Sequence, residues 1–162
     1  MEEEKRMAES YVAFELAGTT YAVPSSVVQQ LEMIEQIVPV PNAPPAAEGV
    51  VYSRGQIIPA VSLRSRFGFE RIPIELRTRL IVVNVDGRTV GLIVDSAREF
   101  ISIAADTIQA PNDAITGTSG RYLKGIATLA DRIILILDLA GVINLSEIVM
   151  NSSEASLSTH AV

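Results

Sequence analysis

Residues 12–23, VAFELAGTTYAV, decide the fold, because residues 81–92, IVVNVDGRTVGL, repeat their pattern. The apolar positions, one threonine and the turn glycine coincide when the second stretch is shifted back by 69 residues. Short apolar runs on either side of a glycine turn are typical of a β-hairpin. Each stretch therefore predicts a hairpin, around Gly18 in the first and around Gly87 in the second.

More positions match further along the chain, at slightly larger shifts that loop insertions would produce. The repeat predicts two similar small β units rather than one large sheet, with chance similarity between two β-rich halves as the alternative. Two such units packed together would create a groove, which favours a binding protein. The matching pairs are Pro41-Asn42 with Pro111-Asn112, Gly49-Val50 with Gly125-Ile126, and Ile57-Ile58 with Ile133-Ile134.

Local patterns predict a mainly β chain with a few short helices. A proline followed by two serines predicts a short helix from residue 24, with Val28 and Leu31 on its apolar face. Arg54-Gly55 predicts the tip of a hairpin. The other expected elements are strands at 11–17, 21–23, 33–38, 50–53, 56–62, 80–85, 89–94, 99–103, 122–129 and 132–138, a helical turn at 63–67 and a helix over 139–150.

The repeat also predicts how the chain is divided. We expect one domain over residues 11–145, made of a first subdomain at 11–67 and a second at 80–145. Most strands of the first would lie within residues 11–62, and most of the second within 80–138. A connector at 68–79 would join them. We expect residues 1–10 to be flexible, and residues 146–162 to hold the end of the last helix and a flexible tail.

Composition limits the class of protein. Apolar residues make up 48% of the 162 residues, and aromatic residues only 5%, so aliphatic side chains must fill the core. The absence of cysteine excludes disulfides and cysteine-ligated metals, and agrees with a reducing cytoplasm. No signal peptide is visible, and the longest aliphatic run, residues 133–137, is far short of the ~20 residues that span a bilayer. We therefore expect a cytoplasmic protein without direct membrane insertion.

Residues that commonly carry catalysis are sparse. The single histidine, His160, lies in the polar tail, and no glycine-rich phosphate-binding motif is present. Asp95 and Asp138 each end an aliphatic strand, where they could form a carboxylate pair for acid–base chemistry or a metal. An aspartate that binds backbone amides at a strand end is the simpler explanation. We therefore predict no enzyme, no catalytic residue, no metal and no cofactor.

Arginines gather in and around the connector, but they do not predict a nucleic-acid site. The net charge of −6 is opposite to the basic footprint of phosphate-binding proteins, and stacking aromatic residues are few. A solvated connector explains the run better. Its members are Arg64, Arg66, Arg71, Arg77 and Arg79, around Glu70 and Glu75.

Several stretches, in this order and spacing, resemble the CheW-like chemotaxis coupling domains. PNAP at 41–44, Gly49-Val50 and RGQIIP at 54–59 resemble the signature of the first half. VGLIVD at 90–95 resembles the core of the second half. YLKGI at 122–126 and RIILILDL at 132–139 resemble the last hairpin and the start of the terminal helix. The likeness covers roughly residues 10–145.

The resemblance implies two five-stranded β-barrels with a hydrophobic groove between them, in an adaptor without catalysis. Such adaptors bridge the cytoplasmic tips of methyl-accepting chemoreceptors to the regulatory domain of a CheA-type histidine kinase. The resemblance places Val28, Leu31 and Arg54 at the receptor-binding face, and it assigns no residue to kinase binding. The protein would then be cytoplasmic, and would join membrane-associated receptor arrays through its partners.

Two positions depart from the family pattern. Tyr52-Ser53 stands where Asn-Leu is usual before Arg-Gly, and Ser62 stands where aspartate is usual. Both changes lie in the hairpin that carries Arg54, so they bear on the type of receptor or on the contact itself. Two alternatives remain open. One is an adaptor of the same fold in a non-flagellar circuit, such as twitching motility or development, and the other is a small-barrel nucleic-acid-binding protein.

Overall fold

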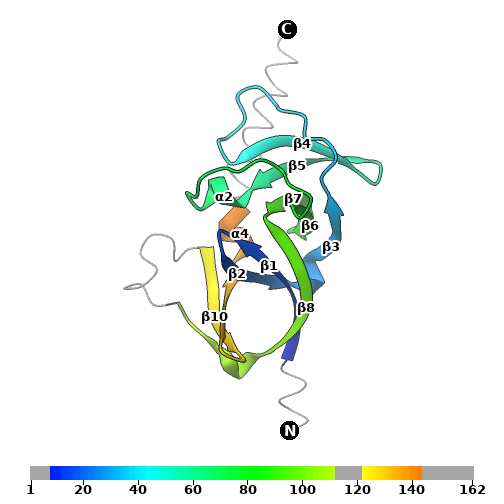
Figure 1. Ribbon diagram of the computed structural model, residues 1–162. Coiled ribbons are helices and arrows are strands. Elements are labelled where there is room, and N and C mark those ends of the chain that lie inside the picture. Colours follow the sequence, from blue (N-terminus) through cyan, green and yellow to red (C-terminus); the bar gives the residue numbers. More distant parts are fainter. Residues whose placement is uncertain (1–7, 112–121, 144–162) are drawn as a thin grey trace.

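The computed structural model describes residues 8–111 and 122–143, which form two β-sheets joined by short helical turns (Figure 1). The strands are β1 (Ala8–Leu16), β2 (Thr19–Pro24), β3 (Val28–Met33), β4 (Ala47–Ser53), β5 (Gln56–Ser62), β6 (Arg79–Val85), β7 (Arg88–Val94), β8 (Ser96–Ala104), β9 (Ile108–Gln109), β10 (Leu123–Leu129) and β11 (Arg132–Leu137). The helical turns are η1 (Ser25–Val27), α2 (Leu63–Arg66), η2 (Ala105–Thr107) and α4 (Leu139–Ile143).

Four hairpins of the described chain close through two-residue turns, as the sequence predicted for three glycine-containing turns. Both residues of each turn have positive φ, a conformation whose twist matches that of the flanking strands. The predicted helical turn after β5 is present as α2, and the Ser62 side chain caps it by accepting a hydrogen bond from the Ser65 N–H at 3.2 Å. The turn residues are Ala17-Gly18, Arg54-Gly55, Asp86-Gly87 and Ala130-Asp131.

Most strands of the first half lie in the second sheet and most strands of the second half lie in the first, as the repeat predicted, but one hairpin of each half is exchanged. The first sheet has the order β8-β1-β2-β11-β10-β9 and the second β3-β6-β7-β5-β4, so each half gives its first hairpin to the sheet of the other half. The division into residues 11–67 and 80–145 therefore describes three of the five strands of the second sheet and four of the six strands of the first. Residues 8–10, which were expected to be flexible, belong to β1, because β8 supplies partners for their backbone groups.

The register of the sheets confirms that the two units are equivalent. Ala60 of β5 lies opposite Gly91 of β7, in a parallel pair. Ile136 of β11 lies opposite Ala22 of β2 in the same way, and these residues are related to the first pair by the shifts seen in the sequence. The mainly β fold with two repeated units is thus confirmed. The first sheet has six strands rather than five, because β9 adds a short edge strand.

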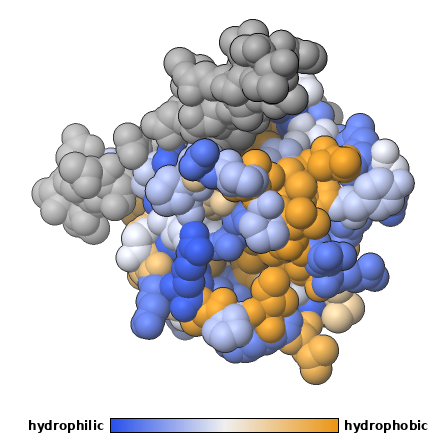
Figure 2. Space-filling model, turned by 90° about the horizontal axis from the view of Figure 1, so that it is seen from above, coloured by the Kyte–Doolittle hydropathy of each residue, from blue (hydrophilic) through white to orange (hydrophobic). Residues whose placement is uncertain are grey.

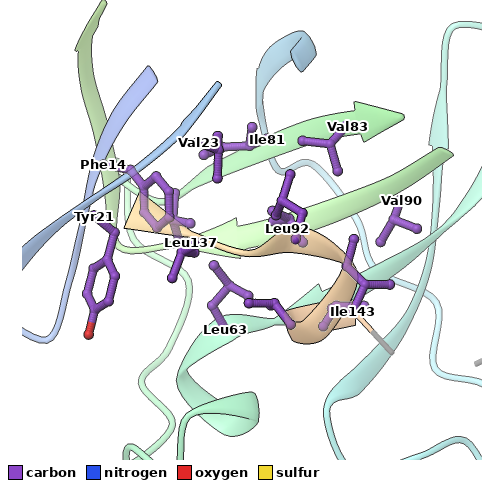
Figure 3. Close-up of a cluster of buried hydrophobic side chains, with 14 of the residues drawn as sticks. Phe14, Tyr21, Val23, Leu63, Ile81, Val83, Val90, Leu92, Leu137 and Ile143 are labelled. Carbon is purple, nitrogen blue, oxygen red and sulfur yellow. The ribbon is translucent and has the colours of Figure 1, made fainter. Parts of the chain in front are cut away.

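Side chains of the central strands alternate between two cores. Leu80 and Val82 of β6 pack inside the second sheet, whereas Ile81 and Val83 face a core shared by both sheets. Strands buried on both faces are apolar at almost every position, as residues 80–83 are. Side chains of this shared core fill the space between the sheets, where a hydrophobic groove was expected. Figure 3 labels Phe14, Tyr21, Val23, Leu63, Ile81, Val83, Val90, Leu92, Leu137 and Ile143 of this core.

Gly49 lets the loop after β3 approach β4 closely. Its φ is +152°, and a Cβ at this position would collide with the backbone carbonyl of Val38. Val38 exchanges two 2.9 Å backbone hydrogen bonds with Val50, and this bridge holds the proline-rich loop against β4. The equivalent Gly125 would bring a Cβ into the side chain of Ile108. Both glycines lie where the register of a hairpin shifts, so the bulge is a repeated feature.

We expect Gly49→Ala to lower the free energy of unfolding by about 2–4 kcal/mol, because it combines backbone strain with a collision against a backbone atom. Gly18→Ala is the matched control. Gly18 also has a positive φ, but a Cβ there meets nothing within 4 Å, so we expect a cost of only about 1 kcal/mol. Denaturant unfolding of both variants measures the difference. Equal losses of stability would show that the close contact with the Val38 carbonyl does not exclude a side chain at residue 49.

The predicted C-terminal helix is present at its start. α4 covers Leu139–Ile143, and its Leu139, Val142 and Ile143 side chains are buried in the shared core. The remainder of that prediction, and the predicted tail, lie outside the described residues.

Candidate functional site

Val28 and Leu31 lie on a strand, so the predicted helix at residues 24–31 is wrong. A single 3-10 turn, η1, follows Pro24 without a side-chain cap, and β3 begins at Val28. The predicted strand at 33–38 is likewise displaced, because β3 ends at Met33. The free edge of β6 explains the outcome, since pairing with it satisfies the backbone of residues 28–33 and partly buries Val28 against the shared core.

Val28 and Leu31 still share one face, through a β-bulge. Residues three apart on a regular strand point to opposite faces. In β3 the register shifts between Val28 and Gln30, so that Val28 lies opposite Val83 and Leu31 lies opposite Ile81. Val83 and Ile81 are two residues apart and both face the shared core. Because paired residues share a face, the bulge returns Leu31 to the face of Val28.

The same face continues to Met33, which sequence reasoning missed. Met33 lies opposite Arg79, two residues beyond Leu31. Exposure rises along this face, because Val28 is partly buried, Leu31 is 38% exposed and Met33 is 58% exposed. We call Val28, Leu31 and Met33 the β3 ladder. Its apolar side chains run from the shared core to the surface, and the period-2 spacing of Leu31 and Met33 was the available sequence signal.

Arg54 occupies the β4–β5 turn, as predicted, with a φ of 45°. It is exposed and lines an open groove of about 380 Å³ between the end of β3 and the end of β4. Met33 also lines this groove, but Val28 and Leu31 do not. The structure therefore brings Arg54 beside the outer end of the β3 ladder rather than beside its two predicted members. The remaining lining residues are Glu32, Ile34, Glu35, Gln36, Val51, Tyr52, Ser53 and Leu80.

A hydrogen bond crosses this groove. The Ser53 hydroxyl donates to Oε1 of Glu32 at 2.9 Å, and Ser53 is only 6% exposed. β3 and β4 are the two edge strands of the second sheet. Among the described residues, this is the only hydrogen bond that joins the two strands. The groove therefore lies between the two edges of the sheet, which do not pair with each other. The pair was not predicted, because its members are 21 residues apart in the sequence.

Asp95 is a structural carboxylate, in agreement with the simpler of its two explanations. Its oxygens accept two hydrogen bonds from Arg64, at 2.7 and 2.6 Å, and one from the Ala17 N–H at 2.9 Å. Burial alone would raise the pKa of Asp95. The Arg64 and Ala17 hydrogen bonds and the Arg64 charge outweigh burial and hold that pKa below its ordinary value. The Asp95 carboxylate is thus engaged in joining Arg64 to the end of β1.

Three arginines in or next to the connector donate hydrogen bonds to backbone carbonyls of other segments. Arg66 donates from Nε to the Val142 carbonyl at 2.6 Å and lies over the Tyr122 ring. Arg71 donates to the Pro45 carbonyl at 2.7 Å, and Arg64 also donates to the Glu70 carbonyl at 2.9 Å. The prediction of solvated side chains is thus wrong for Arg64, whose side chain is 18% exposed, but it agrees with Arg71, whose side chain is 58% exposed. Guanidinium groups engaged in this way do not form a free basic surface for nucleic acid.

Large apolar side chains are exposed around the second sheet. Viewed from the end that bears β4 and β5, the surface carries a hydrophobic strip flanked by polar residues (Figure 2). Contiguous exposed apolar surface of this kind marks sites of association with other proteins. In the described residues, no helix is long and apolar enough to cross a membrane. The exposed apolar residues of β3, β4, β5 and the loop after β3 are Leu31, Met33, Val38, Val40, Tyr52 and Ile57.

Comparison with known families identifies the fold. The family model described as CheW-like domain matches residues 10–147, which is most of the chain. The chain belongs to the CheW-like domain family. The family predicted from the sequence is therefore confirmed.

Individual CheW relatives match over most of their length. The chain is 28% identical to the chemotaxis protein CheW of Klebsiella aerogenes, over 89% of this chain and 87% of that protein. It is 26% identical to the chemotaxis protein CheW of Bacillus subtilis, over 89% and 92%. The crystal structure of the scaffolding protein TtCheW from Thermoanaerobacter tengcongensis has a TM-score of 0.75 and 32% identity, covering 82% of this chain and 86% of that one. The expectation of a chemotaxis adaptor is thus confirmed.

The two departures from the family pattern have different consequences in this CheW-like domain. Ser62 lies at the far end of β5 from Arg54, where it caps α2, a role that serine and aspartate both perform well. Tyr52-Ser53 lies next to Arg54 in the groove. Only the Tyr52-Ser53 departure therefore alters the candidate site, since Ser53 places a hydroxyl donor where leucine is usual.

Proposed function

We propose that this CheW-like domain is a non-catalytic adaptor that couples the cytoplasmic tips of methyl-accepting chemoreceptors to the regulatory domain of a CheA-type histidine kinase. The match of the family model to residues 10–147 carries this proposal, because it spans both sheets. The adaptor would act in the cytoplasm and would reach receptor arrays through its partners. Adaptors of twitching motility or development share the fold, but no feature of this chain favours them.

The β3 ladder and Arg54 support a receptor contact in this region. Val28, Leu31 and Met33 offer an apolar row that ends beside Arg54 and its groove. An amphipathic helix laid along such a row buries its apolar face and keeps its polar face toward solvent. Arg54 forms no ion pair with any described residue, so its guanidinium is available to an acidic group on a partner. The receptor-binding set is therefore proposed to be Val28, Leu31 and Arg54, extended by Met33.

We expect Arg54→Glu and Leu31→Glu to weaken receptor binding by tenfold or more while the fold is retained. Both side chains are exposed, so the expected change in the free energy of unfolding is only about ±0.5 kcal/mol. Affinity is measured by calorimetry for a receptor-tip fragment and, separately, for the kinase regulatory domain, beside a thermal melt. Wild-type protein should bind both, and the kinase affinity should survive these changes if the kinase uses another surface.

Arg88→Glu is the matched control, because it reverses an exposed charge next to the β6–β7 turn, the equivalent hairpin of the other half. It should leave receptor affinity unchanged. Wild-type protein that binds neither partner would refute the proposed function. If the wild-type protein binds the receptor and both variants bind it with the same affinity, only the assignment of these residues is refuted.

A further inference from the structure

The groove beside Arg54 is lined by three charged side chains, one of which is held by a serine that the family pattern does not contain. Glu32 is held by the buried hydroxyl of Ser53, the residue that replaces the usual leucine. Glu35 and Arg54 line the same groove. None of these three charged side chains forms an ion pair with another described residue, in contrast to Arg64, Arg71 and Arg132.

Ser53 restricts where the Glu32 carboxylate can lie. A free glutamate on an edge strand samples several rotamers, and fixing it costs conformational entropy on binding. The 2.9 Å hydrogen bond from Ser53 fixes Oε1 before any partner arrives. The second oxygen, Oε2, accepts no hydrogen bond from the described residues and lies in a groove open to solvent. A carboxylate held in this way is suited to receive a cation.

We infer that Ser53 and Glu32 determine partner specificity at this groove, where Glu32 receives a lysine or arginine from the docked receptor helix. The inference rests on the proposed function, since it names the chemistry of the same contact. Charge complementarity identifies the occupant as a segment with a basic residue for Glu32 and Glu35, and an acidic residue for Arg54. The apolar side of the helix lies on Met33, which links the groove to the β3 ladder.

The experiment compares full-length variants against one receptor-tip fragment from the same genome. Glu32→Gln keeps the side chain's size and removes the charge, and we expect it to weaken binding about tenfold at low salt. Ser53→Ala removes the hydroxyl and should weaken binding about threefold. The double variant should be no weaker than Glu32→Gln alone, because Ser53 acts through Glu32. Asp106→Asn removes one charge on η2, outside the groove, and is the matched control.

Salt and stability distinguish docking from a structural role. The difference between wild type and Glu32→Gln should shrink as salt is raised, because an ion pair is screened. Melting temperatures should stay within a few degrees of wild type. If the wild-type protein binds the receptor and Glu32→Gln binds it equally well, the inference about Glu32 is refuted and the proposed function is not. A loss confined to the kinase domain overturns the receptor as occupant, and wild-type protein that binds no receptor overturns both proposals.

Discussion

Replacing Asp95 with alanine is expected to lower the free energy of unfolding by about 3–5 kcal/mol, the usual cost of removing one partner from a buried ion pair. The Asp95 side chain is 9% exposed and the Arg64 side chain 18%. Loss of the carboxylate leaves Arg64 with a partly buried, unpaired charge and the Ala17 N–H without its acceptor. Denaturant unfolding of the variant measures the change.

The exposed pair of Arg132 with Glu99 supplies the control. These side chains are 45% and 44% exposed and 3.0 Å apart, so Arg132→Ala is expected to cost less than about 1 kcal/mol. Arg64→Ala should resemble Asp95→Ala, because it breaks the same pair. A cost for Asp95→Ala as small as that of Arg132→Ala would mean that the Arg64 contact does not hold the connector in place.

The pH dependence of stability follows from the same carboxylate. Its pKa in the folded protein lies below the ordinary value of 3.8, so the folded state favours the ionised form. The resulting stability is fully present above the unfolded-state pKa, and it is lost as the pH falls through about 4 toward the folded-state pKa. Asp95→Asn should therefore lose less stability than wild type between neutral pH and pH 3.

Local patterns predicted the hairpins because their causes are local. The turns at Gly18 and Gly87 need positive φ, and the alternating apolar residues beside them need a sheet. The segment from Pro24 to Leu31 was predicted wrongly, because a serine pair before valines is compatible with a helix start. The open edge of β6 decides the matter, and that edge belongs to a strand about fifty residues further along the chain.

The candidate site was only partly predictable for a related reason. Arg54 was found because a glycine turn places it at a hairpin tip whatever its surroundings. The common face of Val28 and Leu31 was predicted from helical spacing, and it exists because of a bulge at Gln29. Glu32 and Ser53 carried no local signal, since their contact depends on how the sheet curls to bring its two edges together.

The exchange of hairpins predicts that neither half of the chain folds alone. We expect residues 1–67 and 68–162, produced separately, to show no cooperative melt. In the first fragment, β1 and β2 lose their neighbours β8 and β11, and β3 and β5 lose β6 and β7. The shared core would be exposed in both, and small units that expose this much apolar surface do not stay folded. Circular dichroism and one-dimensional proton spectra measure the outcome.

Mixing the two fragments should restore the folded state as a one-to-one complex, because every lost strand pair is supplied by the other fragment. The matched control is intact protein cleaved at a protease site inserted between residues 72 and 76, which should stay folded, since the chain runs there without strand pairing. A cooperative melt of either isolated fragment would show that the repeat still marks independent units.

The repeat is visible in the sequence because each half keeps the same strand pattern. Which sheet a hairpin joins is settled by side chains such as Ile81 and Leu137, which belong to different sheets and are both buried in the shared core.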